Sequence, residues 1–234
     1  MITPTLTTAT LIKKELLDEE LGYFTFKLEN TISFKAGQFI SLKDDKDNDK
    51  RFHSFSLTNK NSDETKEIEL FIRKKGEFTT KLFKSAIGSE FKMITPTGNY
   101  HLENNDKEKI FIAGGAGIAP LIGMIKTLYE QKKEKLTGKL FYSSRFEQEL
   151  AFKKELKNIE KNSEFKTILT ITREQPKNWG GELGHIDKRM ITKYIDKIDE
   201  KEYYICGPPP FVEAIKETLT NLKVNINNIK IEEW

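Results

Sequence analysis

The sequence has a single cysteine, Cys206, and only three histidines among its 234 residues. One thiol cannot form an internal disulfide, hold an iron–sulfur cluster or build a structural zinc site. The histidines, His53, His101 and His185, lie far apart in the sequence and show no ligand-type spacing. We therefore expect no metal site built by the chain itself, and a redox activity would need an organic cofactor.

Long apolar runs are also missing, and the mean hydropathy is −0.57. No stretch reaches the roughly 18 apolar residues of a membrane-spanning helix. The N-terminus lacks a basic start followed by an apolar run, so we expect no secretory signal and a cytoplasmic location. The 39 basic and 36 acidic residues are interspersed, which indicates no nucleic-acid partner.

The chain changes character after about its first hundred residues. The first part alternates apolar and polar residues in short segments, which predicts an antiparallel barrel or sandwich; the strands expected are 23–28, 39–42, 68–72 and 91–94. The second part alternates strands with helices, which predicts a parallel sheet; we expect strands at 110–113, 139–142, 165–172, 202–206 and 229–232 and helices at 120–131, 147–161, 187–195 and 210–222. We divide the chain into domains at 1–104 and 105–234.

A glycine-rich turn separates the first strand and the first helix of the second domain. It reads Gly114-Gly115-Ala116-Gly117-Ile118-Ala119-Pro120. Glycine allows a sharp turn and close approach of a ligand, and the start of a helix offers free N–H groups to a pyrophosphate. An ordinary strand-to-helix turn explains the pattern about as well. Its position at the first strand of a βαβ region favours a nucleotide site.

Two further segments each have a purely structural and a functional interpretation. A strand over 51–59 places Arg51, His53 and Phe55 on one face, suited to a phosphate and a flat ring, or is simply half-buried. The segment Gly76–Leu82 is a capped helix start or a phosphate site with Thr79 as a donor. Cys206, at a strand end before Gly207 and Pro208, is by itself more often a small buried apolar residue.

Taken together, the order of these segments resembles the ferredoxin–NADP reductase family of two-domain flavoprotein reductases. The resemblance extends from about Thr5 to Trp234 and rests on five motifs in the family's order. These are Gly37-Gln38-Phe39, the strand at 51–59, Gly76 to Thr79, Gly114 to Pro120 and Cys206 to Pro209, followed by the acidic and aromatic end Glu232-Glu233-Trp234. The resemblance implies a Greek-key barrel that binds FAD, followed by an α/β domain that binds NAD(P)H.

The family's flavin motif, Arg, any residue, Tyr or Phe, then Ser, fits this chain in two registers. In the first, Arg51 is the motif arginine, His53 replaces the aromatic residue and Ser54 follows. In the second, His53 replaces the arginine and Phe55-Ser56 completes the motif. We prefer the second register because it keeps the aromatic–Ser pair. Another departure is Ala116, where the family often has Thr.

The resemblance implies hydride transfer from NAD(P)H to FAD, with the nicotinamide approaching the flavin near Cys206. It assigns catalytic roles to Ser56, Cys206, Glu232 or Glu233, and Trp234, which would cover the flavin ring opposite Phe55. The residues expected to bind cofactor are Arg51, His53, Ser54, Phe55, Ser56, Gly76, Thr79, Gly114, Gly115, Ala116, Gly117, Ile118, Pro120, Ser143, Arg145, Cys206, Gly207, Pro208 and Trp234.

The choice of nucleotide and the acceptor are less constrained by the sequence. After the strand at 139–142 come Ser143, Ser144 and Arg145 without an acid, which favours NADPH, although the same loop can hold the adenosine of NADH. With one cysteine, the chain must pass electrons to a separate acceptor: ferredoxin, flavodoxin, a haem protein, free flavin or a partner subunit. The alternative is a non-catalytic binding or regulatory protein on the same scaffold.

Overall fold

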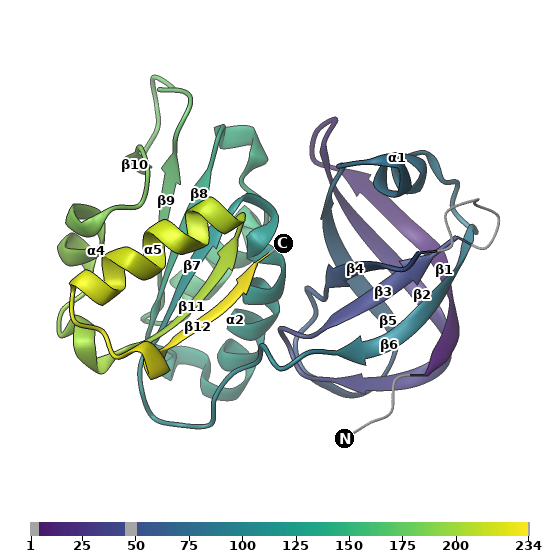
Figure 1. Cartoon of the computed structure of the whole chain (residues 1–234), viewed down its shortest axis with the longest axis horizontal. Coiled ribbons are helices and arrows are strands. Elements are labelled where there is room, and N and C mark those ends of the chain that lie inside the picture. The colour runs from purple at the N-terminus through teal and green to yellow at the C-terminus, as the bar shows by residue number, and fades with distance from the viewer. Residues whose placement is uncertain (1–4, 45–50, 234) are drawn as a thin grey trace. The chain divides into compact units, whose positions relative to one another are not determined.

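A computed structural model of the chain describes residues 5–44 and 51–233. The chain forms two compact units. The first comprises residues 1–102 with 122–127, and the second comprises residues 103–121 with 128–234. Each unit contains one six-stranded sheet, labelled in Figure 1. Among the described residues, no helix is both long and apolar enough to cross a membrane.

The first unit is a curled antiparallel sheet with strand order β4-β3-β6-β1-β2-β5. Its strands are β1 (Leu6–Leu16), β2 (Leu21–Phe34), β3 (Phe39–Lys43), β4 (His53–Ser56), β5 (Ser62–Arg73) and β6 (Glu90–Thr97). An antiparallel bridge between Leu57, directly after β4, and Leu70 of β5 links the two edges of the sheet. The expected antiparallel barrel is thereby confirmed.

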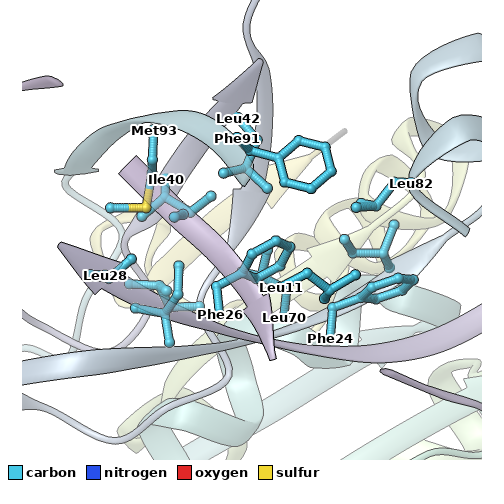
Figure 2. Packing of buried hydrophobic residues seen from close by; sticks show 14 of the residues in the cluster. Leu11, Phe24, Phe26, Leu28, Ile40, Leu42, Leu70, Leu82, Phe91 and Met93 are labelled. Atoms are coloured by element: carbon cyan, nitrogen blue, oxygen red, sulfur yellow. The ribbon is translucent and has the colours of Figure 1, made fainter. Parts of the chain in front are cut away.

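The core of this barrel follows from the alternation along its strands. In β2, Phe24, Phe26 and Leu28 are buried, and the residues between them face outward or lie half-buried. Figure 2 shows these side chains packed with Leu11, Leu42, Leu70, Phe91 and their neighbours. One short helix, α1 (Glu77–Lys84), adds Phe78, Leu82 and Phe83 to the same cluster.

The second unit is a parallel sheet with strand order β10-β9-β8-β7-β11-β12. Its strands are β7 (Lys109–Gly114), β8 (Lys139–Ser144), β9 (Lys166–Ile171), β10 (Glu182–Leu183), β11 (Glu202–Gly207) and β12 (Ile229–Glu233). The α-helices that follow the strands are α2 (Ile118–Lys132), α3 (Lys153–Lys161), α4 (Lys188–Tyr194) and α5 (Pro209–Asn221). The expected α/β domain with a parallel sheet is confirmed.

Both faces of this sheet are apolar, which is why its central strands lack polar alternation. All residues of β7 and β11 are buried. Residues such as Ile112, Phe141 and Ile205 form one cluster with residues of α4 and α5. The neighbouring residues along the strands point to the opposite face, where the Phe111 and Tyr204 rings stack 5.6 Å apart.

Two expected elements differ from the structure. The helix expected at 147–161 is a short 3-10 turn, Glu147–Glu149, followed by α3, because Phe152 adopts a left-handed conformation with φ of +58°. The strand expected at 68–72 begins earlier, because β5 starts at Ser62, which pairs with Phe34 of β2.

Candidate cofactor and nucleotide sites

The flavin-motif residues lie on β4, whose register with β3 fixes the direction of each side chain. His53 pairs with Leu42 and Phe55 with Ile40, and both partners are fully buried. Directly opposed residues of antiparallel strands share a face, so His53 and Phe55 point to the barrel side. Their rings stack on Phe78 of α1 with centroids 4.3 Å and 6.0 Å away, respectively.

The two serines of the motif point the other way and differ from each other. Ser54 is exposed, and its Oγ lies 3.0 Å from Oγ of Ser41 on β3. Ser56 is half-buried opposite Phe39. Arg51 is exposed and precedes β4. The structure thus places both residues that distinguish the second register, His53 and Phe55, in one aromatic stack.

The turn before α1 is shaped to leave N–H groups of the helix accessible. Gly76, its N-cap residue, has φ of +88°, and a Cβ added there would point into open space, away from residues other than its chain neighbours. Within the described residues, no side chain caps this helix start. The Thr79 hydroxyl instead accepts from N–H of Lys75 at 2.7 Å and donates to the Gly76 carbonyl at 3.3 Å. Thr79 therefore stabilises the turn, and the backbone supplies the donors.

In the second unit, the glycine-rich turn lies at the carboxyl edge of the sheet. Gly115 has φ of +55°, and Gly115–Gly117 form a 3-10 turn before α2. A Cβ on Gly117 would lie 2.2 Å from the carbonyl oxygen of Cys206. The backbones of this turn and of β11 therefore meet where only glycine fits. The Ile118 side chain is buried, so this residue can offer a ligand only its backbone.

Strand register brings the remaining candidates to the same edge. Cys206 lies between Ala113 of β7 and Glu232 of β12, and Gly114 pairs with Ser143 of β8. The structure thus assembles the expected edge residues of this unit: Gly114 to Ile118, with Pro120 in the first turn of α2, Ser143, Arg145, Cys206 to Pro208 and Glu232. Trp234, assigned to the flavin by the resemblance, lies outside the described residues.

The two titratable groups in this row are the buried Cys206 and the half-buried Glu232, and the pKa of each is raised. Burial, and after it the carboxylate of Glu232, raises the pKa of the Cys206 thiol. Burial also raises the pKa of Glu232. Cys206 is therefore a neutral thiol with 1% exposure, and it is not suited to act as a nucleophile.

The raised pKa of Glu232 predicts a pH-dependent effect of Glu232→Gln on stability. A carboxyl whose pKa is higher in the folded state stabilises fully below its unfolded value, and this contribution is lost as pH rises through the folded value. Glu232→Gln is therefore expected to raise Tm at about pH 7, with a difference that vanishes near the ordinary value of 4.5. Thermal unfolding across pH checks this. Glu233→Gln, at the exposed neighbour, is the control, and parallel curves for wild type and Glu232→Gln would contradict the assignment.

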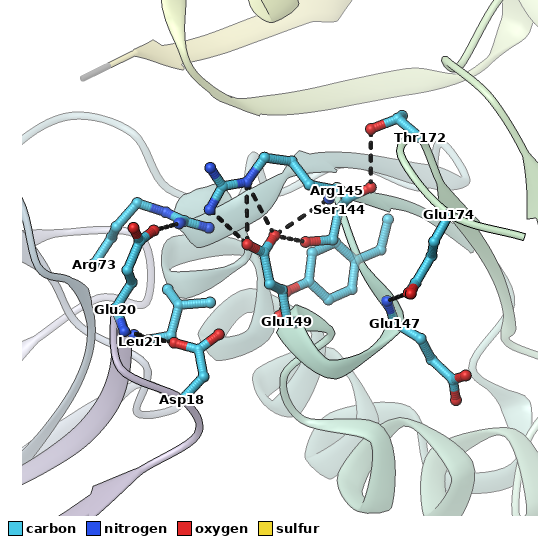
Figure 3. A network of polar contacts seen from close by, with 11 residues as sticks. Asp18, Glu20, Leu21, Arg73, Ser144, Arg145, Glu147, Glu149, Thr172 and Glu174 are labelled. Atoms are coloured by element: carbon cyan, nitrogen blue, oxygen red, sulfur yellow. Dashed lines mark hydrogen bonds and ion pairs between the residues drawn. The ribbon is translucent and has the colours of Figure 1, made fainter. Parts of the chain in front are cut away.

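Sequence reasoning missed Glu149, which is only 4% exposed and forms hydrogen bonds with the residues at the end of β8. Its carboxylate accepts from the Ser144 hydroxyl at 2.8 Å and from Nε of Arg145 at 3.0 Å, as Figure 3 shows. The second guanidinium contact, from Nη2 of Arg145, is 2.5 Å long. An acid is therefore present beside the serine–arginine loop. The only sequence signal was its spacing of four residues from Arg145.

Comparison with known proteins agrees with this division of sites. The model of the oxidoreductase FAD-binding domain matches residues 8–102, and that of the oxidoreductase NAD-binding domain matches residues 111–217. NADH-cytochrome b5 reductase 1 of Eremothecium gossypii is 28% identical over 222 residues, which are 91% of this chain and 77% of that protein.

Two solved structures have the same fold. A ferredoxin NADP+ reductase from Neisseria gonorrhoeae with bound FAD and NADP has a TM-score of 0.84 at 20% sequence identity. The superposition covers 97% of this chain and 98% of the reductase chain. The Amycolatopsis cytochrome P450 reductase GcoB has a TM-score of 0.87 at 21% sequence identity. The superposition covers 100% of this chain and 71% of the GcoB chain.

Proposed function

From the premise that this chain belongs to the ferredoxin–NADP reductase-like family and is an NAD(P)H-dependent FAD oxidoreductase, we propose that NADH is its reductant and a separate haem protein its electron acceptor. The observation that carries the binding of a reduced nucleotide is the row Ala113, Cys206 and Glu232, with Gly117 against Cys206, at the carboxyl edge of a parallel sheet. Ligands of open α/β sheets bind at this edge.

When bound, FAD would supply the chemistry that couples two-electron transfer from a reduced nicotinamide to one-electron transfer to an acceptor. The residues of the chain bind and orient the reactants. The N–H groups of Gly115 to Ile118 hold the pyrophosphate of the dinucleotide, and Cys206 packs against its nicotinamide ring. Glu232, half-buried beside Cys206, holds a proton more tightly than an ordinary carboxyl.

On the flavin side, the half-buried Ser56 offers its hydroxyl to a ring nitrogen of FAD, and Phe55 forms a wall for the ring system. The first N–H groups of α1, left open by Gly76, hold the diphosphate.

The preference for NADH rests on Glu149. An acid near the end of the second strand favours the ribose diol, and a cation favours a 2′-phosphate. The Arg145 guanidinium, which the sequence suggested for the phosphate, donates to the Glu149 carboxylate at 2.5 and 3.0 Å. An acid therefore adjoins this loop, and the arginine that would bind a 2′-phosphate is paired with it.

A haem acceptor is proposed because the relative from Eremothecium gossypii is named for cytochrome b5, and the chain has one cysteine and hence no cluster of its own. Purified protein with FAD is reduced anaerobically in a stopped-flow instrument by NADH or NADPH, then mixed with cytochrome b5, ferredoxin or flavodoxin. Fast flavin bleaching by NADH and fastest reoxidation by the haem protein are expected. Fastest reoxidation by either of the other carriers would overturn the acceptor assignment.

Glu149→Gln is expected to change the nucleotide preference. The amide keeps an oxygen that can accept from Ser144 and Arg145 but removes the negative charge, so kcat/KM for NADPH is expected to rise about tenfold with little change for NADH. Steady-state reduction of ferricyanide with each nucleotide measures the ratio.

The control is Glu147→Gln, an acid of the same loop that pairs with Lys153 at 3.2 Å. If wild type already prefers NADPH, the candidate reader of its 2′-phosphate is Arg173. This residue is exposed, and its N–H donates to the Arg145 carbonyl at 2.9 Å. Selective loss of NADPH use in Arg173→Ala would then replace the NADH assignment.

A further inference from the structure

The middle of α2 is part of the first unit, although the helix begins at the glycine-rich turn of the second. Residues 122–127 form one compact unit with the barrel. Within that unit, Gly123, Lys126 and Thr127 meet one segment, residues 58–61, which follows β4. Residues three and four positions apart lie on the same side of a helix, so one face of α2 holds this segment.

Gly123 and Lys126 hold the first half of the segment 58–61. A Cβ added to Gly123 would lie 2.4 Å from the carbonyl oxygen of Asn59, so the two backbones approach where only glycine fits. Nζ of Lys126 donates to the Thr58 carbonyl at 3.2 Å and lies 3.6 Å from Oε2 of Glu69. The Lys126 ammonium group thus links α2 to the segment and to β5.

Thr127 holds the second half of the segment with its hydroxyl group. The hydroxyl accepts from N–H of Asn61 at 2.9 Å and donates to the Gly123 carbonyl at 2.9 Å. A threonine within a helix often forms the second of these bonds, so the bond from Asn61 is the additional feature here. Because Thr127 is 3% exposed, removing its hydroxyl would break both bonds at a buried position.

The segment that α2 holds is the direct continuation of the flavin strand. Ser56 is the last residue of β4, and N–H of the next residue, Leu57, donates to the Gln38 carbonyl at 3.0 Å. Leu57 alone separates Ser56 from the segment 58–61. A displacement of this segment therefore changes the direction in which the Ser56 hydroxyl points, and a hydrogen bond weakens steeply when its direction changes.

We propose that Thr127 is a positioning residue for the flavin: by holding residues 58–61, it fixes the Ser56 hydroxyl that is offered to a ring nitrogen of FAD. This inference rests on the role of Ser56 in the proposed function. It gives a residue in the interior of α2, outside the flavin motif and the glycine-rich turn, a task in the FAD site.

The experiment is a double-mutant cycle of Ser56→Ala and Thr127→Val in the full chain. It measures the Kd of FAD for the deflavinated protein by quenching of flavin fluorescence. Ser56→Ala is expected to weaken FAD binding about fivefold, as for the loss of one hydrogen bond, and Thr127→Val about threefold. Because Thr127 acts through Ser56, the double variant is expected to lose about fivefold, whereas independent effects would multiply to about fifteenfold.

Two further variants separate positioning from a general effect on the fold. Thr127→Ser keeps the hydroxyl and is expected to bind FAD like wild type. Thr218→Val on α5 is the matched control, because the Thr218 hydroxyl also donates to a carbonyl four residues earlier, that of Ala214, at 2.8 Å. Its FAD affinity is expected to match wild type. Thr127→Ala takes the place of Thr127→Val in the cycle if the valine variant does not fold.

Several results would overturn the proposal. These are losses that multiply in the double variant, wild-type affinity in Thr127→Val or Ser56→Ala, and an affinity of Thr127→Ser as low as that of Thr127→Val. Failure of the proposed function itself would look different, because wild type would then bind no FAD or its bound flavin would not be bleached by NADH.

Discussion

Gly117→Val is expected to abolish reduction of the flavin while FAD stays bound. A Cβ on Gly117 would lie 2.2 Å from the oxygen and 2.5 Å from the carbon of the Cys206 carbonyl group. These are backbone atoms of a fully buried strand, so they cannot rotate away as a side chain would. The substitution must separate the start of α2 from the end of β11. This separation disrupts both the pyrophosphate turn and the position of Cys206.

The measurement is stopped-flow bleaching of the bound flavin by NADH, with the FAD content of the purified protein as the second readout. We expect the reduction rate to fall by at least about 100-fold, equivalent to about 2.7 kcal/mol of activation free energy. Gly117→Ala carries the same Cβ without the Val methyls and is expected to show a smaller loss. This variant keeps the test informative if Gly117→Val does not fold.

Gly180→Ala is the control for a glycine-to-larger change in the same unit. An added Cβ there would meet no described residue within 4 Å other than its chain neighbours. Its flavin reduction is expected to match wild type. Normal reduction rates in Gly117→Val would place the dinucleotide elsewhere and remove the central argument for the site.

The nucleotide-binding half was predictable because its local signals agree with its packing. Its strands are apolar on both faces, and its helices start near proline or aspartate, as at Pro208 and Asp187. The sequence pattern therefore predicts the alternation of strands with helices and their order along the chain. In the barrel, β1 was not anticipated as a strand of its own. Its pairing with β2 shifts register between Leu11 and Lys13, and this bulge interrupts the two-residue alternation.

The site was predictable where backbone shape alone defines it, and not where side chains fold back on one another. Glycine at 114, 115 and 117 marks a turn in any context. The burial of the Glu149 side chain depends on the hydrogen bonds that its carboxylate accepts from Ser144 and Arg145. The left-handed conformation of Phe152 separately interrupts the helix expected from 147. The sequence pattern predicted neither the buried Glu149 nor the interrupted helix, because hydrophobic periodicity does not distinguish a solvated acid from a buried one.

A second hidden feature is the buried ion pair of Lys109 and Glu202, whose side chains are 5% and 3% exposed. The strand expected at 110–113 begins one residue earlier, with Lys109 as the first residue of β7. Its Nζ lies 2.6 Å from Oε2 of Glu202 and 2.5 Å from Oδ1 of Asn105. Glu202 also accepts from the Tyr204 hydroxyl at 2.9 Å.

This network satisfies every oxygen of the Glu202 carboxylate. Burial alone would raise the pKa of Glu202, but hydrogen bonds from Lys109, Asn105 and Tyr204 outweigh it, and the pKa is lowered. A lowered pKa means that the carboxylate stabilises the fold above its unfolded value near 4.5 and that this contribution is lost as pH falls. The same network holds residues 103–105 on the sheet, since N–H of Glu103 donates to the Tyr204 hydroxyl at 2.8 Å.

Lys109→Met is therefore expected to reduce the free energy of unfolding by about 3–5 kcal/mol, because it leaves a buried carboxylate without its cation. Urea unfolding at about pH 7 measures this loss, which is expected to shrink at about pH 4, where Glu202 becomes protonated on unfolding. Arg189→Ala, which removes an ion pair whose arginine is 93% exposed, is the control and is expected to cost less than about 1 kcal/mol. The double substitution Lys109→Met with Glu202→Met is expected to recover much of the loss, because an apolar pair of similar volume replaces two charges without leaving either unpaired. If the double variant were as unstable as the sum of its parts, the network would stabilise the unit through its neutral hydrogen bonds to Asn105 and Tyr204, and the ion pair itself would contribute little.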